Sequence, residues 1–332
     1  MSSNRNQDAH LSNPETARDI GLLAAVARAY YVEERSRVEI AEVFGISRFK
    51  VSRLLSRARE EGVVTIEIHD WGLPDPVLSA RLNEVLGLTR CLVVRSHGDD
   101  ETMRRQIGAA AAAHLSETLA DDEVLGVSWG RTLTATTSQL EHLPRLSIVQ
   151  LTGVVAGDLD SSPIEVARHV ARRSGGRVYP IFAPLITPDV ETAEGLRSHA
   201  DIASAMELFP SVTTALLSVG AWDKPRGEGH AVLSQVHDVL SLEDLAGAIA
   251  DGCVADIAGL LVRADGSLAY PELQRRSINI TDEQLRAVPR VLGVAGGAAK
   301  ATAVRAVAGA GLITELVTDH ALAAEIVGDD DA

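Results

Sequence analysis

Short apolar runs alternate with helical segments through most of the chain beyond residue 77, and this alternation constrains the fold most strongly. Each run has the length and the β-branched content of a buried strand. Helical segments lie between most of them, for example at Glu101–Leu119, Pro163–Arg173 and Ala298–Val307. Strands joined through helices form a parallel sheet with right-handed crossovers, so the pattern predicts an α/β fold. The predicted strands are Cys91–Val94, Val124–Val127, Ser147–Leu151, Arg177–Phe182, Ala215–Val219, Gly259–Val262, Arg290–Val294 and Glu315–Thr318.

The composition is compatible with such a core. Hydrophobic residues make up 46% of the 332 residues and aromatic residues only 3%, so the packing must rely on Ala, Val, Leu and Ile. Cys91 and Cys253 lie far apart, without a neighbour at metal-ligand spacing. We therefore expect both to be buried apolar residues, and we predict no disulfide, metal site or cofactor.

Several features predict how the chain is divided. Its length exceeds one core of ordinary size, so we expect two folded units. The stretch DWGLPDP at residues 70–76 has one Gly and two Pro and breaks any regular element. We therefore predict a helix-turn-helix domain at residues 18–70, a linker at 71–77 and a larger α/β domain at 78–330.

The polar amino-terminal residues have no hydrophobic signal region, and no apolar run reaches the roughly 18 residues of a membrane span. We expect a cytoplasmic protein without a membrane partner. Residues 1 to about 17 show no apolar period and are expected to form a mobile tail.

The small domain begins with a predicted helix from Ile20 to Tyr31, where apolar residues recur at helical spacing. Ser36 and Glu39 form a capping box that opens a second helix, and Gly45 can take the positive φ of the sharp turn that ends it. Ser47 can cap a third helix. One side of this third helix is apolar and must face the core: Val51, Leu54, Leu55 and Ala58.

The exposed side of the third helix carries the features of a DNA-reading surface. Five basic residues and no acidic one lie between Arg48 and Arg59. A helix-turn-helix places its second helix in the major groove, where arginine can read guanine, phenylalanine can pack on a thymine methyl group and lysine can neutralise phosphate. The predicted DNA-binding residues are Ser47, Arg48, Phe49, Lys50, Ser52, Arg53 and Arg57.

The alternative for this segment is an ordinary amphipathic helix pair with a solvated basic face. The coincidence of a capping box, a glycine turn, a basic exposed face and a following strand favours DNA binding. That strand is the alternating run Val63–Ile68, a candidate for the wing that follows many such helices.

Charge is unevenly distributed along the chain. The net charge is -15, but residues 1–64 carry 10 Lys and Arg against 9 Asp and Glu, and the remainder carries 21 against 37. A near-neutral module with one basic helix, joined to an acidic body, is compatible with a small DNA-binding unit whose partner domain does other work.

Two strand-to-helix junctions in the large domain resemble anion sites. The first, VLGVSWGRT at Val124–Thr132, runs from a strand through a glycine turn into a helix, whose first N–H groups can bind an anion. Ser128 and Thr132 can donate hydroxyl hydrogen bonds, and Arg131 can supply a guanidinium fork. A simple strand-to-helix turn, with the glycine serving geometry alone, explains this local pattern equally well.

The second junction is VLGVAGGAAK at Val291–Lys300, where Gly296 and Gly297 follow a strand. A lysine in the first turn of a helix is unfavourable against the dipole unless it meets an anion, which singles out Lys300. The spacing matches neither a dinucleotide fold nor a nucleotide P-loop. Asp256, in GCVADIAG, could accept hydrogen bonds from sugar hydroxyl groups, although an ordinary loop or helix carboxylate is no less compatible with this local pattern.

Taken together, these segments resemble the SorC family of sugar-binding transcription regulators, which is sometimes grouped with DeoR-like repressors. The similarity covers nearly everything after residue 20. The segments that carry it are IAEVFGISRFKVSRLL (40–55), GVSWGRTL (126–133), VQLTG (149–153), YPIFAPL (179–185), GCVADIAG (252–259) and VLGVAGGAAKATAV (291–304).

The resemblance implies that the large domain shares the fold of phosphosugar isomerases, deaminases and CoA transferases and uses it for sensing. It also implies a homo-oligomer, a dimer or tetramer, on operator DNA. A sugar or sugar phosphate effector would be held at Ser128, Gly130, Arg131, Thr132, Asp256, Gly296, Gly297 and Lys300.

We therefore predict a DNA-binding regulator of a carbohydrate operon that is not an enzyme. The alternative is a phosphosugar isomerase-like enzyme with a DNA-binding appendage, in which Asp256 and Lys300 would act as acid and base. Against it, the spacing of the residues reveals no carboxylate pair and no nucleophile-histidine set. DNA packaging without ligand control is weaker still, because it leaves the acidic domain without a purpose.

Overall fold

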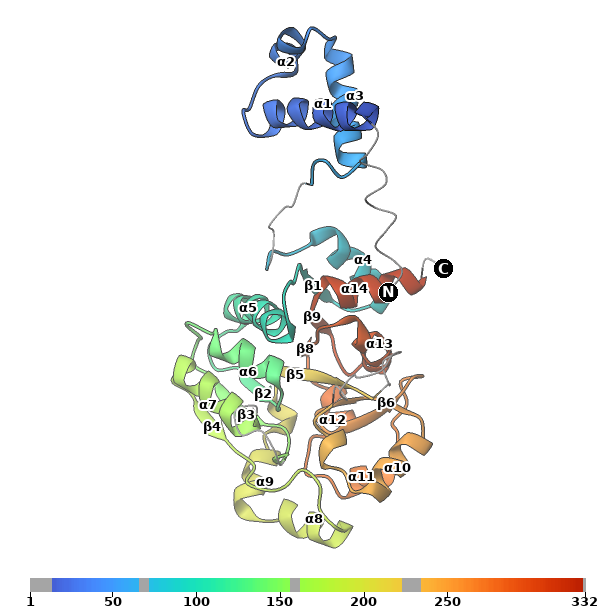
Figure 1. Ribbon diagram of the computed structural model, residues 1–332. Coiled ribbons are helices and arrows are strands. Elements are labelled where there is room, and N and C mark those ends of the chain that lie inside the picture. The colour runs from blue at the N-terminus through green and yellow to red at the C-terminus, as the bar shows by residue number, and fades with distance from the viewer. Residues whose placement is uncertain (1–13, 66–71, 156–161, 223–233, 331–332) are drawn as a thin grey trace. The chain divides into compact units, whose positions relative to one another are not determined.

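The computed structural model describes residues 14–65, 72–155, 162–222 and 234–330. The chain divides into two compact units, residues 1–69 and 70–332, which are coloured along the chain in Figure 1. No described helix is long and apolar enough to cross a membrane.

The small unit consists of three helices, α1 (Pro14–Tyr31), α2 (Arg37–Phe44) and α3 (Arg48–Glu60). The predicted capping box is confirmed, and Gly45 ends α2 at φ 61° with its N–H donated to Ala41 and Glu42. The hydroxyl of Ser47 accepts a hydrogen bond from the N–H of Lys50 and caps α3, as predicted. The apolar sides of the three helices form one core, whose members include Leu23, Val26, Ile40, Val51, Leu54, Leu55 and Ala58.

Two sequence predictions in this unit were wrong at their boundaries. Helix α1 begins at Pro14, inside the expected tail, because proline is well suited to a first helical turn and the residues after it include the good helix formers Glu15, Ala17 and Arg18. Residues 63–65 form no strand. The N–H of Val64 bonds to the carbonyl of Ala58, and Val63 and Val64 pack against the three-helix core. Residues 66–68 of the expected wing lie outside the described residues.

The large unit is built on a parallel sheet with the strand order β1-β9-β8-β5-β2-β3-β4. All eight predicted strands are present, shifted at their ends by a few residues. The strands of this path are β1 (Arg90–Val94), β2 (Val124–Val127), β3 (Ser147–Gln150), β4 (Arg177–Tyr179), β5 (Thr214–Ala221), β8 (Arg290–Val294) and β9 (Glu315–Asp319).

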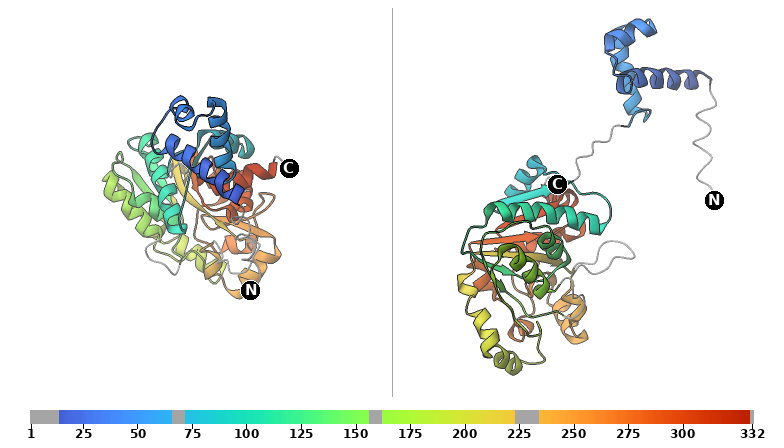
Figure 2. Two further views of the ribbon diagram at one scale, coloured as in Figure 1. Left: turned by 45° about the horizontal axis from the view of Figure 1, so that its top comes forward. Right: turned by 90° about the vertical axis from the view of Figure 1, so that its left-hand side faces the viewer.

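Helices cover both faces of this sheet (Figures 1 and 2). One face packs against α4 (Pro76–Leu86), α13 (Ala301–Gly309) and α14 (His320–Asp330), and the other against α5 (Asp100–Thr118), α6 (Arg131–Ser138) and α7 (Pro163–Ser174). Alternate residues of β5 enter the two cores, with Leu217 in one and Leu216 in the other. The remaining helices are α8 (Val190–Arg197), α9 (Ala200–Met206), α10 (Leu242–Ala250), α11 (Pro271–Arg275) and α12 (Asp282–Arg286), with short 3-10 turns η2 (Phe209–Ser211), η3 (His237–Val239) and η4 (Ala298–Lys300).

The sheet is not wholly parallel, which corrects the expectation from the sequence. An additional strand, β6 (Cys253–Ile257), forms an antiparallel hairpin with β7 (Leu260–Arg263) and pairs antiparallel with the end of β5. The two turn residues, Ala258 and Gly259, both have positive φ, at 49° and 81°, which matches the twist of a tight hairpin. Asp256, expected to lie outside any strand, therefore lies within one.

Both cysteines are buried and free, as predicted. Burial raises the pKa of each thiol, that of Cys91 and that of Cys253, to about 12. Such thiols remain protonated at neutral pH and act as small apolar side chains.

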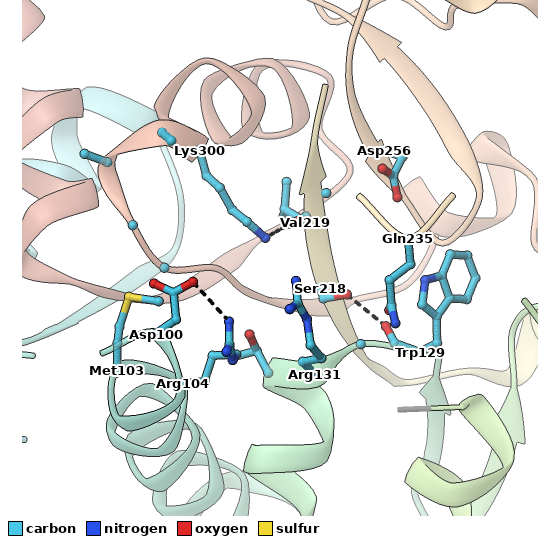
Figure 3. Close-up of a pocket in the computed structure, with 17 residues that line it drawn as sticks. Asp100, Met103, Arg104, Trp129, Arg131, Ser218, Val219, Gln235, Asp256 and Lys300 are labelled. Atoms are coloured by element: carbon cyan, nitrogen blue, oxygen red, sulfur yellow. Dashed lines mark hydrogen bonds and ion pairs between the residues drawn. The ribbon is translucent and has the colours of Figure 1, made fainter. Parts of the chain in front are cut away.

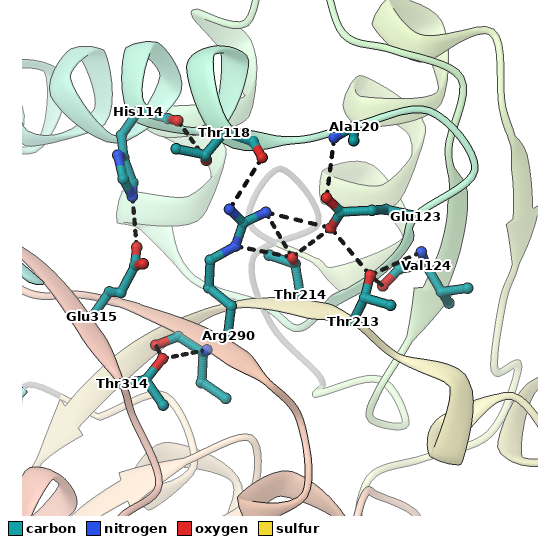
Figure 4. A network of polar contacts seen from close by, with 11 residues as sticks. His114, Thr118, Ala120, Glu123, Val124, Thr213, Thr214, Arg290, Thr314 and Glu315 are labelled. Carbon is teal, nitrogen blue, oxygen red and sulfur yellow. Dashed lines mark hydrogen bonds and ion pairs between the residues drawn. The ribbon is translucent and has the colours of Figure 1, made fainter. Parts of the chain in front are cut away.

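A polar network closes the edge of the sheet where the parallel strands begin (Figure 4). The guanidinium of Arg290 donates to the hydroxyl of Thr214 at 2.8 Å and to the carbonyl of Thr118 at 3.2 Å, and it lies 3.3 Å from Glu123. Glu123 also accepts hydrogen bonds from the hydroxyl groups of Thr213 and Thr214. The amino-terminal ends of β2, β5 and β8 are thereby joined by side chains that form hydrogen bonds and an ion pair with one another.

Candidate functional site

The exposed side of α3 presents cations that no acidic residue neutralises in the described part of the chain. Arg48, Lys50 and Arg53 are exposed and form no ion pair there. Phe49 is 72% exposed, and the Arg48 guanidinium lies 5.1 Å from its ring centre. An exposed aromatic ring beside free cations can contact base edges and phosphates together.

Three of the predicted DNA-binding residues have internal contacts. The hydroxyl of Ser47 caps α3, and that of Ser52 donates to the carbonyl of Arg48 at 3.3 Å. Arg57 pairs with Glu61 at 2.7 Å and lies 3.7 Å from Asp19. The hydrogen bond of Ser47 gives it a structural role as the cap of α3. The ion pairs of Arg57 make it less available to phosphate than Arg53.

The large unit contains a pocket of about 290 Å³ at the edge of the sheet where the parallel strands end (Figure 3). It brings together residues from segments far apart in the sequence, as expected where loops follow parallel strands. Seven of the eight predicted effector-binding residues line it: Gly130, Arg131, Thr132, Asp256, Gly296, Gly297 and Lys300. The eighth, Ser128, is 1% exposed and is not among the residues that line the pocket.

The turn after β2 directs the start of α6 at the pocket. Gly130 has φ 148°, and a Cβ atom there would lie 2.5 Å from the hydroxyl oxygen of Ser218, so only glycine fits. Ser218, at the end of β5, donates to the carbonyl of Trp129 at 2.9 Å and holds this turn against the neighbouring strand. The first N–H groups of α6 have no partner within the helix, and Arg131 and Thr132 line the pocket beside them.

A second turn, which follows β8, also lines the pocket. Gly297 has φ 90° and donates its N–H to Asp319 at 2.9 Å. A Cβ atom on Gly296 would lie 2.4 Å from the side chain of Ile107. The two glycines therefore let the chain turn tightly and approach α5 closely before η4 begins.

Lys300 extends its amino group across the pocket to the end of β5, where it donates to the carbonyl of Val219 at 2.5 Å (Figure 3). Burial lowers the pKa of Lys300 to about 8; the charge of Asp256 opposes this effect, and the charges of Arg131 and Arg104 add to it. At neutral pH the amino group is mostly protonated. With Arg131 it gives this end of the pocket a positive charge suited to an anion.

Asp256 is 4% exposed and supplies a carboxylate to the pocket. Burial raises its pKa, while hydrogen bonds from Ser234 and Trp222 and the charges of Lys300 and His237 oppose that effect. The indole N–H of Trp222 donates to Oδ1 at 2.8 Å. A carboxylate held this way can accept hydrogen bonds from ligand hydroxyl groups.

Several pocket residues were not predicted. Ser218 and Val219 end a predicted strand and Gly220 follows it, and the rule that ligands bind beyond the carboxyl ends of parallel strands could have indicated all three. Arg104, paired with Asp100 at 3.6 Å, comes from α5, and nothing in its local sequence distinguishes it from a solvated helix residue. The other pocket residues missed from the sequence are Met103, Trp129, Gln235, Ala298 and Ala299.

Comparison with known proteins identifies the family of the large unit. Residues 75–328 match the family described as "Putative sugar-binding domain". The chain is 29% identical over 319 residues to the transcriptional regulator LsrR of Klebsiella pneumoniae subsp. pneumoniae, with 92% of each chain covered. It is 25% identical over 318 residues to the erythritol catabolism regulatory protein EryD of Brucella abortus, over 93% of this chain and 97% of that one.

The fold is also similar to a solved one. The crystal structure of the full-length sorbitol operon regulator SorC from Klebsiella pneumoniae matches with a TM-score of 0.68 at 22% identity. The match covers 93% of this chain and 99% of that one. The likeness therefore extends through both units of the chain.

Proposed function

The chain belongs to the SorC family of sugar-binding transcriptional regulators, and from this premise we propose that it regulates a carbohydrate operon by binding operator DNA under the control of a sugar or sugar phosphate. The observation that carries the proposal is the pocket, which combines an anion-binding side with a buried carboxylate. Arg131, Lys300 and the start of α6 suit a phosphate or another anion. Asp256 suits the hydroxyl groups of a sugar or polyol.

The DNA-binding half of the proposal rests on α3. Its exposed side offers Arg48, Phe49, Lys50 and Arg53 to a major groove, with Ser52 and Arg57 beside them. One such helix reads only a few base pairs, so we propose that the protein acts as a homo-oligomer, a dimer or tetramer, on repeated half-sites. Light scattering coupled to gel filtration tests this, and a monomer at working concentration would contradict it.

The deciding experiment is fluorescence anisotropy of labelled DNA from upstream of the protein's own operon, at several salt concentrations. The panel contains erythritol, sorbitol, ribose and glucose, each with its terminal phosphate ester. We expect tight, sequence-selective binding that one compound alters. Binding no tighter than to random DNA would contradict the proposal, as would binding that no compound in the panel changes.

One observation favours a second candidate function, a phosphosugar isomerase. The pKa of Asp256 is raised and that of Lys300 is lowered to about 8, and both groups face one pocket, as catalytic acids and bases often do. We propose sensing rather than turnover. Detectable interconversion of aldose and ketose phosphates by the purified protein, abolished in Lys300→Ala, would instead establish the enzyme.

Operator DNA and a small sugar meet in the bacterial cytoplasm, and we propose that the protein acts there. Effector binding would change the operator affinity by no more than the ratio of the effector's affinities for the DNA-bound and the free conformation. The same anisotropy titration, repeated with saturating effector, measures this difference directly.

A further inference from the structure

The carboxylate of Asp256 occupies space that a neighbouring glycine leaves open. Asp256 on β6 and Gly220 on β5 are directly paired across the antiparallel strands. A Cβ atom on Gly220 would lie 2.1 Å from Oδ1 and 2.8 Å from Oδ2 of Asp256. Gly220 is not among the glycines with positive φ, so the need for glycine comes from this contact and not from the backbone. Any side chain at position 220 would displace the carboxylate.

Trp222 determines where the carboxylate points. It lies two residues after Gly220, and its indole N–H donates to Oδ1 of Asp256 at 2.8 Å. The indole is itself fixed, since Trp222 is 9% exposed and belongs to an apolar cluster with Leu185 and Leu261. It also meets the ring of His237 edge-on at 5.4 Å. Trp222 is not among the residues that line the pocket, and Asp256, to which it donates its hydrogen bond, is.

We propose that Gly220 and Trp222 are positioning residues that hold the Asp256 carboxylate toward the hydroxyl-bearing end of the effector, and that they thereby set the selectivity of the pocket for sugars and polyols. The inference rests on the proposed function, because it names the part of the effector that this side of the pocket recognises. Gly220 supplies the space and Trp222 supplies the direction. The opposite side, with Arg131 and Lys300, suits the anionic end of the effector, and neither residue forms a hydrogen bond with Trp222.

The variant that isolates the hydrogen bond is Trp222→Phe, which keeps an aromatic ring and removes the N–H donor. We expect it to weaken binding of the sugar phosphate selected from the panel about tenfold, the usual effect of losing a hydrogen bond to a charged group. Binding of inorganic phosphate, which has no carbon-bound hydroxyl groups, should not change. Equal losses for both ligands would overturn the inference.

The matched control is Tyr270→Phe. Tyr270 packs in the same apolar cluster, and its hydroxyl donates to Asp244 at 3.2 Å without contacting Asp256. We expect this variant to bind both ligands as the unmodified protein does. A tenfold loss in Tyr270→Phe would mean that general loosening of the cluster, and not the direction of Asp256, explains the Trp222 result.

A pH profile separates positioning from packing. The groups that face Asp256 are Lys300, His237 and Cys253 in addition to its two donors. Loss of the indole donor removes an interaction that favours the ionised carboxylate, so its pKa should rise. The acid limb of sugar phosphate binding should therefore move to higher pH in Trp222→Phe, and an unmoved acid limb would overturn the inference.

A ligand-free measurement keeps the inference testable if the proposed function fails. The NMR signal of the Trp222 indole N–H, assigned from its loss in Trp222→Phe, should shift as Asp256 titrates. This shift should vanish in Asp256→Asn. A protein that binds no sugar phosphate but shows the titration would contradict the proposed function and retain the positioning, whereas a signal independent of Asp256 would overturn the positioning itself.

Discussion

Lys300 gives the pocket a pH dependence at the scale of a single residue. Burial lowers its pKa to about 8, so the amino group loses its charge as the pH rises from 7 to 9. Affinity for inorganic phosphate should fall about tenfold over this range, because only a tenth of the amino groups stay protonated one unit above their pKa. Isothermal titration calorimetry at three pH values measures this change in phosphate affinity.

The matched variant for that measurement is Lys300→Arg, which keeps the positive charge at every pH in the range. Its affinity should vary less between pH 7 and 9 than that of the unmodified protein. An equally steep decline in Lys300→Arg would assign the dependence to another group.

Glu123 links folding stability to acid pH. Burial would raise its pKa, but hydrogen bonds from Thr214, the backbone N–H of Ala120 and Thr213, together with the charge of Arg290, hold it below its usual value. A lowered carboxylate pKa stabilises the fold above the pKa of the unfolded chain, and this stabilisation is lost as the pH falls through the folded value. The free energy of unfolding should therefore decline below about pH 4.5.

The variant Glu123→Gln should lower the free energy of unfolding at pH 7 by about 2 kcal/mol, since it removes the charged partner of Arg290. It should also flatten the decline at acid pH. Urea unfolding at pH 7, 5 and 4 measures both effects, with Glu117→Gln on the exposed side of α5 as the control. If the free energy of unfolding of Glu123→Gln declined with falling pH as steeply as that of the unmodified protein, the acid dependence could not be assigned to Glu123.

At the scale of the element, α3 provides two arginines that test DNA reading. Arg53 is exposed in the amino-terminal half of the helix, and Arg59 is exposed near its carboxyl end. Arg53→Ala should weaken operator binding about tenfold, within the range expected for one lost base contact, and should leave the melting temperature unchanged. Arg59→Ala should have a smaller effect. Equal effects of the two variants would indicate a general attraction between charges.

How far the sequence predicted the elements depends on how local their signals are. The caps at Ser36 and Ser47 and the buried side of α3 were predicted correctly, because capping and helical spacing act within a few residues. Strand β6 was missed because its hairpin turn, Ala258-Gly259, lacks the usual Asn-Gly signal. The pocket glycines and Lys300 could be found from their junctions. Arg104 could not, because only the packing of α5 brings it to the pocket.

For the molecule as a whole, the two compact units allow an experiment on separate pieces. Each unit has its own apolar core within the described residues. A fragment of residues 72–332 should fold alone, bind the same sugar phosphate within about threefold of the full chain, and not bind operator DNA. Circular dichroism melting and calorimetry measure this. A fragment that fails to fold would show that the larger unit requires the smaller one.

The pocket is assembled from pieces that are independent of one another in the sequence. The turn after β2, the end of β5, the hairpin strand β6, the turn after β8 and the face of α5 each contribute side chains, whereas the Arg290 network fixes the strands at the opposite edge. Substitutions of side chains that only line the pocket can therefore accumulate during evolution without loosening the sheet, whereas Gly130 and Gly220 are constrained by their close contacts. Gene duplication followed by such changes would yield paralogues that share one scaffold and respond to different nutrients.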